Sequence, residues 1–203
     1  MDPNYTMSEG FWDFSNRIYR SPDVRQCCLS LQDLYGLDVN LLLFACWHAR
    51  SRGLFESALV ARALAFSGHW ADQVVKPLRS ARRWMKAQTE SDLDEEFQTL
   101  REEIKALELQ CERFQENTLE AMVAAPRLQL SIEMQIASAV YNLHYILLGA
   151  FDPRALSRPL PLRNLLATLV LSALDQNPDD ELLHQAVSRE LLAQRLGAPP
   201  YDR

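Results

Sequence analysis

The sequence predicts an all-α protein of about eight helices, built as an N-terminal helical core with a long antiparallel helical hairpin. Three observations lead to this prediction. Apolar residues recur at helical spacing along most of the 203 residues, helix start and stop residues separate these segments, and no alternating strand pattern of useful length occurs. A chain of this length with 48% apolar residues can bury a sizeable core without a disulfide or a metal ion.

Residues 1–68 are expected to form the helical core. Pro22 begins one helix and Gly36 ends it, because proline suits the first helical turn and glycine a left-handed cap. Asp38 is expected to cap the next helix, which is apolar nearly all round and therefore central. The helices expected here span about 9–19, 22–35, 39–52 and 56–66, and the last one stops near Ser67 and Gly68.

Residues 69–125 are expected to form an amphipathic helical hairpin. One face of its first arm is apolar, at Val74, Leu78, Ala81 and Met85, and Pro77 is expected to kink or split this helix. The second arm carries apolar residues in alternating steps of four and three over about four heptads, which predicts one helix over 93–124. These residues are Leu93, Phe97, Leu100, Ile104, Leu107, Cys111, Phe114, Thr118 and Ala121.

This heptad seam has two interpretations. It is either the inside of the hairpin or the interface of a homodimer. The intramolecular interpretation is favoured, because a matching apolar face lies directly upstream across a short turn.

Residues 126–203 are expected to form the C-terminal helices, packed back on the core so that the chain makes one compact domain overall. Helices are expected over about 131–150, 162–174 and 179–196, and a proline-rich connection precedes the second of them.

Charge and cysteine content limit the possible partners and compartments. The net charge is −6, and residues 91–125 carry 3 basic and 10 acidic residues, so general binding of nucleic acid is not expected. The four cysteines, Cys27, Cys28, Cys46 and Cys111, lie in apolar runs and are interpreted as reduced thiols. Because no signal peptide or membrane-spanning run is found, a cytoplasmic location is expected.

The N-terminal half carries motifs that resemble a known family. They are an aromatic opening at Phe11-Trp12-Asp13-Phe14-Ser15, the segment CLSLQDLYGLDVNLLLF over residues 28–44, and WADQVVKPLR over residues 70–79. With these motifs the chain resembles an uncharacterised proteobacterial family, a domain of unknown function. The resemblance covers residues 11–119 well and the C-terminal third weakly, and it implies no activity.

Motifs for catalysis, metals and cofactors are weak in this chain. It has no G-x-S-x-G elbow and no glycine loop for phosphate. Glu181 and His184 form one Glu-x-x-His motif, whereas a di-iron site needs two such motifs and two further glutamates. No catalytic residue, metal or cofactor is therefore assigned, and an enzyme is not favoured.

Two groups of residues are candidates for binding. The first is a basic stripe on the first arm, formed by Lys76, Arg79, Arg82, Arg83 and Lys86. It suits an acidic partner, phosphate backbone or anionic lipid, and the alternative is a solvated face that complements the chain's own acidic helix.

The second group lies in and beside the most apolar helices, at Asp38, Asn40, His48, Tyr141 and His144. If helices 39–52 and 131–150 meet, these side chains would line a small polar pocket. The alternative is that Asp38 acts as a cap and that Asn40 and His48 satisfy backbone groups or each other.

The leading hypothesis is a non-enzymatic protein-interaction module, adaptor or regulatory, whose hairpin contacts another protein. The alternative is a helical small-molecule-binding protein or enzyme with a polar pocket near Asn40 and His144. Local binding of nucleic acid through the basic stripe is a third, weaker hypothesis.

Overall fold

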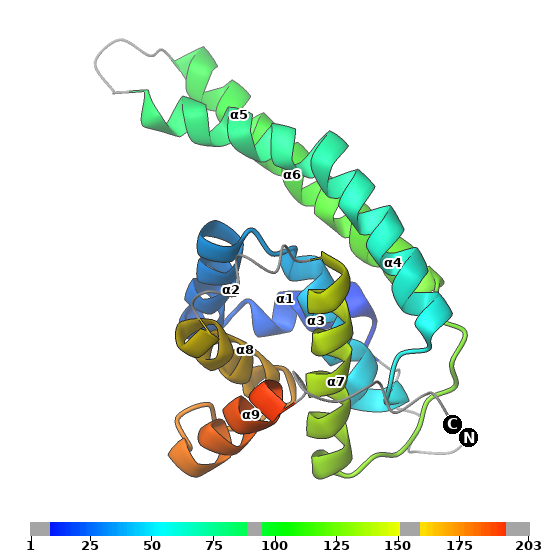
Figure 1. Cartoon of the computed structure of the whole chain (residues 1–203). Helices are drawn as coiled ribbons and strands as arrows, with labels where there is room; N and C mark the ends of the chain where they lie inside the picture. The colour runs from blue at the N-terminus through cyan, green and yellow to red at the C-terminus, as the bar shows by residue number, and fades with distance from the viewer. Residues whose placement is uncertain (1–8, 89–94, 151–158, 194–203) are drawn as a thin grey trace, which may run out of the picture.

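A computed structural model describes residues 9–88, 95–150 and 159–193 of the chain (Figure 1). No strand occurs among these residues, which confirms the predicted all-α class. The elements are α1 (Phe11–Ile18), α2 (Pro22–Tyr35), α3 (Val39–Arg52), α4 (Ser57–Trp70), the π-helical turn η1 (Ala71–Val75), α5 (Lys76–Ala87), α6 (Glu95–Ala121), α7 (Ile132–Ala150), α8 (Pro159–Ala173) and α9 (Glu181–Ala193). Leu93, most of the proline-rich connection and the C-terminal tail lie outside the described residues.

The helix α3 forms the centre of the core, as its apolar sequence predicts. Every residue from Leu41 to Ala49 is buried. The side chain of Asp38 caps this helix by accepting hydrogen bonds from the backbone N–H groups of Asn40 and Leu41, at 3.0 and 3.4 Å. α7 packs along α3, and α1, α6 and α8 also contact it, so residues far apart in the chain meet around one helix.

The helices α4 and α5 form one continuous curved rod with η1 between them (Figure 1). The predicted stop at Ser67 and Gly68 is therefore wrong, because a single glycine inside a helix costs only about 1 kcal/mol. The π-helical turn directly precedes the segment with Pro77, whose ring would clash with the carbonyl of Gln73 in a regular α-helix. A wider turn at this point accommodates the proline without breaking the rod.

This rod lies alongside α6, and the two together form an arm that extends from the rest of the molecule (Figure 1). Their contacts run in opposite chain directions. Arg62 donates to the carbonyl of Met122 at 2.9 Å, the indole of Trp70 donates to the carbonyl of Cys111 at 3.1 Å, and Arg79 pairs with α6 further on. We call α4, η1, α5 and α6 together the arm.

The C-terminal helices close the other side of the core. α8 packs against α2 and α9, and α7 lies between α3 and α9. None of the helices in the described ranges has the length and apolar character that crossing a bilayer requires.

Candidate functional site

A cleft of about 540 Å³ lies between the arm and the core. The end of α2, the turn at Gly36–Asp38 and the start of α3 line one wall, and η1, α5 and α6 line the other. Gly36 ends α2 with a φ of +66°, a left-handed conformation that favours glycine, and its backbone N–H closes the helix on Gln32. Local capping chemistry therefore shapes one wall of the cleft.

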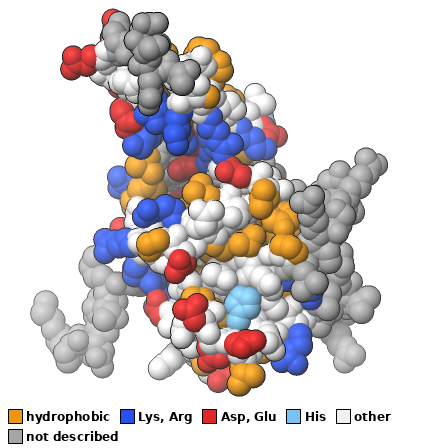
Figure 2. All heavy atoms as spheres, turned by 90° about the vertical axis from the view of Figure 1, so that its left-hand side faces the viewer, with side chains coloured by type: hydrophobic (Ala, Val, Ile, Leu, Met, Phe, Trp, Pro, Cys, Tyr) orange, Lys and Arg blue, Asp and Glu red, His pale blue; other side chains and the backbone are white. Residues whose placement is uncertain are grey.

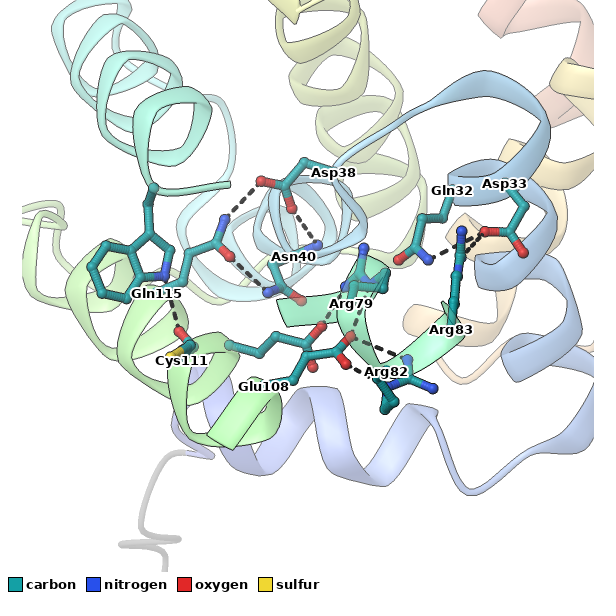
Figure 3. Close-up of polar contacts among 12 residues, drawn as sticks. Gln32, Asp33, Asp38, Asn40, Arg79, Arg82, Arg83, Glu108, Cys111 and Gln115 are labelled. Carbon is teal, nitrogen blue, oxygen red and sulfur yellow. Dashed lines mark hydrogen bonds and ion pairs between the residues drawn. The ribbon is translucent and has the colours of Figure 1, made fainter. Parts of the chain in front are cut away.

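The floor of the cleft is a polar network that joins the core to the arm (Figure 3). Gln115 on α6 donates a hydrogen bond of 2.7 Å to the carboxylate of Asp38 and accepts one of 2.9 Å from the side-chain amide of Asn40. Burial raises the pKa of Asp38, and the hydrogen bonds from Gln115 and from the backbone offset part of that rise.

A second polar group, next to this network, holds α5 to α6 (Figure 3). Arg79 donates to Glu108 at 2.8 Å and to Glu112 at 2.6 Å, and Arg82 donates to Glu108 at 2.5 Å. Burial raises the pKa of both glutamates, but the hydrogen bonds from Arg82 and Arg79 outweigh it at Glu108, whose pKa falls below its ordinary value. The pKa of Glu112 stays raised, because Arg79 compensates for less of its burial.

The rim of the cleft carries exposed ion pairs. Arg83 pairs with Asp33 at the end of α2. Lys76 pairs at 2.5 Å with Asp72, which lies one helical turn before Lys76 in the chain. Figure 2 shows this face of the molecule, where Lys and Arg side chains gather on the arm above the core. Lys76, Arg79 and Arg83 line the cleft, whereas Lys86 is exposed and does not line it.

The residues of the predicted basic stripe thus lie in two different environments. Arg82 and Arg79 face the acidic helix of the same chain, which is the contact that the alternative interpretation of the stripe describes. Lys76 and Arg83 remain at the solvent-exposed rim, each paired with an exposed carboxylate.

The residues proposed for a polar pocket do not all come together. Asp38 and Asn40 line the cleft, but His48, Tyr141 and His144 do not. α3 and α7 pack together as expected, yet Asp38 and His48 are ten residues apart, which separates them by about 15 Å along the helix axis. The polar groups at the start and near the end of α3 therefore lie in two different regions of the molecule.

His48 belongs to a separate buried network around the backbone of Gly53. Its Nδ1 lies 3.1 Å from the carbonyl of Gly53, and the side-chain amide of Asn142 donates to the same carbonyl at 3.0 Å. Burial lowers the pKa of His48 to about 4, so the ring is neutral near pH 7. Tyr141 and His144 are only partly buried on α7, and burial lowers the pKa of His144 as well.

A stripe of four glutamates on α6 was not predicted from the sequence. Glu108, Glu112, Glu116 and Glu120 are spaced four residues apart and share one side of the helix. These glutamates have different environments. The first two form ion pairs with arginines of α5. Glu120 accepts a hydrogen bond from the backbone N–H of Phe11 at 2.9 Å, and Glu116 is only 3% exposed. The regular four-residue spacing of these glutamates was the signal in the sequence that could have predicted the stripe.

Two cysteines of α2 lie in the core. Burial raises the pKa of Cys27 to about 12 and that of Cys28 to about 11, so both thiols are protonated near pH 7. Among the residues with described side chains, no group of three or more His, Cys, Asp or Glu is placed to hold a metal ion.

The comparison with family models links this architecture to other proteins. A family model described as "Protein of unknown function (DUF2390)" matches residues 10–119. The chain belongs to this family. The region shared with DUF2390 begins one residue before α1 and ends inside α6, so it includes the described residues that line the cleft, apart from Gly149. No curated protein and no solved structure matches the chain.

The C-terminal boundary of the DUF2390 match does not coincide with a structural boundary. α7 lies outside the matched residues, yet it packs along α3 and contributes buried residues such as Leu143 to the core. The DUF2390 region of this protein therefore shares one hydrophobic core with the C-terminal helices.

Proposed function

We propose that this protein is a non-enzymatic interaction module, and that its arm binds an amphipathic helix of a partner protein. The observation that supports this proposal is an exposed apolar strip on the arm. Leu100, Leu107 and Phe114 on α6 are 49%, 47% and 52% exposed, respectively. They occupy positions of the predicted heptad, at intervals of seven residues.

The apolar heptad residues of α6 form two sets, one partly buried and one exposed. Phe97, Ile104 and Cys111 are partly buried, whereas the residues three positions after each of them are about half exposed. An α-helix drifts by only about 20° over seven residues, so the open positions form a nearly straight strip. Phe114 also lies beside Trp70, with ring centroids 4.8 Å apart, which extends the strip towards the rod.

The rod contributes apolar residues that are likewise turned away from the cleft. Pro77, Ala81 and Trp84 are exposed, Trp84 to 63%, and none of them lines the cleft, whereas Lys76 and Arg83 on the same helix do. We call Pro77, Ala81, Trp84, Leu100, Leu107 and Phe114 the outer flank.

The chemistry of the outer flank favours a helix as its partner. Two helices that lie side by side leave a groove, and a third helix with apolar residues at seven-residue intervals can fill it. Glu103, four residues before Leu107, is an exposed charged residue on the same side of α6. The basic stripe is a weaker candidate for binding the partner helix, because Arg79 and Arg82 already pair within the chain.

Site-specific crosslinking in the full-length chain tests this proposal. A photoreactive amino acid replaces Leu107 in one variant and Leu182, an exposed leucine of α9, in the matched control. We expect an adduct with one protein from position 107 only. A purified helix from that protein should then bind native chain, and Leu107→Glu should weaken the binding at least tenfold while Leu182→Glu does not.

Two outcomes would overturn the proposal. Equal adducts from both positions, or binding unaffected by Leu107→Glu, would show that the outer flank does not bind a partner. An adduct of the chain with itself, with a dimer in sedimentation equilibrium, would replace the partner helix by the homodimer considered from the heptad seam. Thermal melting of each variant checks that the fold is retained.

We also propose a cytoplasmic location for this activity. All four cysteines are free, three of them buried, and reduced thiols are typical of the cytosol. Fractionation of cells that produce the tagged full-length protein tests this location, and recovery in a membrane or exported fraction would contradict it.

A further inference from the structure

Three cations of the arm line the cleft from one helix. Lys76, Arg79 and Arg83 stand at positions i, i+3 and i+7, so they project from neighbouring turns of one side of α5. Lys76 and Arg83 are about 10 Å apart along the helix axis, a gap that two long side chains can close around one group.

The two outer cations form surface ion pairs. Lys76 and Asp72 are 60% and 59% exposed, and Arg83 and Asp33 are 51% and 46% exposed. Exposed pairs of this kind contribute little to stability, so an incoming oxyanion can replace either carboxylate at small cost. Arg79 differs from them, because it is largely buried and holds Glu108 and Glu112.

The acids deeper in the cleft are not available to compete for these cations. Asp38 already accepts hydrogen bonds from Gln115 and from two backbone N–H groups, and Glu112 accepts one from Arg79. Burial also raises the pKa of both carboxyl groups.

The cleft has the size and the neutral groups of a small-molecule site. Its volume of about 540 Å³ falls within the range of about 300–1,000 Å³ that is usual for ligand pockets. Ser80 and Gln32 line it beside the cations and offer uncharged hydrogen-bond donors, while Leu37 and Val75 add apolar surface.

We propose that the cleft binds a small ligand through an oxyanion group, a phosphate or a carboxylate, held between Lys76 and Arg83. In this arrangement the oxyanion replaces Asp72 and Asp33 as the partner of the two cations, and the remainder of the ligand lies over the start of α3. The site is separate from the outer flank and does not depend on the proposed partner helix.

Titration of the full-length protein with pyrophosphate and with citrate, at constant ionic strength, tests the site. Each probe is followed by isothermal calorimetry and by the melting temperature. We expect at least one probe to bind and raise the melting temperature, and the Lys76→Gln, Arg83→Gln double variant to bind it at least tenfold more weakly. The choice between the probes distinguishes a phosphate from a carboxylate ligand.

A matched control separates this site from general charge effects. Lys105 forms a surface pair with Glu102 at 2.8 Å on α6, away from the cleft, and is 60% exposed like Lys76. Lys105→Gln removes one positive charge and should leave the affinity within twofold of the native value. No binding of either probe, or equal loss in the control and the double variant, would overturn the proposal.

Removing the competing carboxylates gives a test in the opposite direction. Asp33→Asn and Asp72→Asn free the two cations, so the double variant should bind the probe several-fold more tightly than the native protein. Unchanged or weaker binding in this variant would contradict the exchange on which the proposal depends.

Discussion

The side-chain amide of Gln115 donates a 2.7 Å hydrogen bond to the carboxylate of Asp38, from which it is separated by 77 positions in the chain. Gln115 lies on the arm, and Asp38 caps the central helix of the core. Because the same amide accepts a hydrogen bond from Asn40, one neutral side chain couples the arm to the start of α3. The position of the arm over the cleft therefore depends on a residue outside the apolar heptad.

Replacing Gln115 by leucine should lower the free energy of unfolding by about 2–3 kcal/mol. The substitution leaves Asp38 and Asn40 without their partner in a confined place, and hydrogen bonds to charged groups contribute about 1.5–3 kcal/mol. Urea denaturation followed by circular dichroism measures the change. Gln110→Leu, on the exposed side of α6, is the control and should change the value by less than about 0.5 kcal/mol. A similar small change in Gln115→Leu would contradict the coupling.

Local signals in the sequence predicted most helix ends, because those ends depend on nearby residues. Pro22 begins α2, Gly36 ends it, and Asp38 caps α3, as expected. The end of α4 was missed because Gly68 is only a weak helix breaker. Contacts of the rod with α6 and α7 compensate for its cost, and such contacts are not visible in a local pattern.

The heptad of α6 predicted the helix but not which face is covered. Leu107 is 47% exposed, whereas the next residue, Glu108, is only 5% exposed. Successive helix residues differ by about 100° in direction, so the most buried face is rotated from the apolar strip towards the glutamates. Pairing of Glu108 with Arg79 and Arg82 makes this burial possible, and apolar spacing carries no information about that pairing.

Glu116 should make the stability of the protein depend on pH. Burial is the main cause that raises its pKa from 4.5 to about 8. The nearby carboxylates of Glu112, Asp38 and Glu120 add to this rise, and a hydrogen bond with Ser15 offsets part of it. Between about pH 5 and pH 8 the folded protein therefore holds a proton that the unfolded chain releases. The contribution of Glu116 to stability accordingly falls as the pH rises through this range.

The Glu116→Gln variant should remove this dependence. Its free energy of unfolding, relative to the native protein, is expected to rise with pH by up to about 1.4 kcal/mol per unit between about pH 5 and 8. Urea denaturation at several pH values gives the difference. Glu103→Gln, at an exposed position of the same helix, should give a curve parallel to that of the native protein. A parallel curve for Glu116→Gln as well would show that its carboxyl is already ionised at pH 5.

The candidate pocket could be predicted only in part. The sequence shows that polar groups lie within apolar helices, but it does not show at which end of a helix each one finds its partners. Asn40 meets Gln115 of α6, whereas His48, two turns later, meets the loop at Gly53 together with Asn142. Whether these polar side chains meet depends on how α3 crosses α6 and α7, which is a property of the tertiary structure.

Asn142→Ala should be among the most destabilising polar substitutions in this chain. Asn142 is fully buried, donates to the carbonyls of Ala45 and Gly53, and accepts the backbone N–H of Phe55 at 2.8 Å. Its removal leaves the buried backbone N–H of Phe55 without this acceptor and takes one donor from each of the two carbonyls, so we expect a loss of about 2–4 kcal/mol in the free energy of unfolding. Thermal and urea denaturation measure the loss. Asn117→Ala, at an exposed position of α6, is the control, and equal effects of the two would refute this role.

Two glycines at the cleft should respond to alanine in opposite directions. Gly36 has a φ of +66°, which disfavours any residue with a Cβ, so Gly36→Ala should lower the free energy of unfolding by about 1 kcal/mol. Gly68 lies inside the rod, where an added Cβ meets no atom within 4 Å, so Gly68→Ala should raise it by about 0.5–1 kcal/mol through helix propensity. Paired urea denaturation curves measure both effects. Destabilisation by Gly68→Ala would mean that the last turn of α4 needs the backbone freedom of glycine.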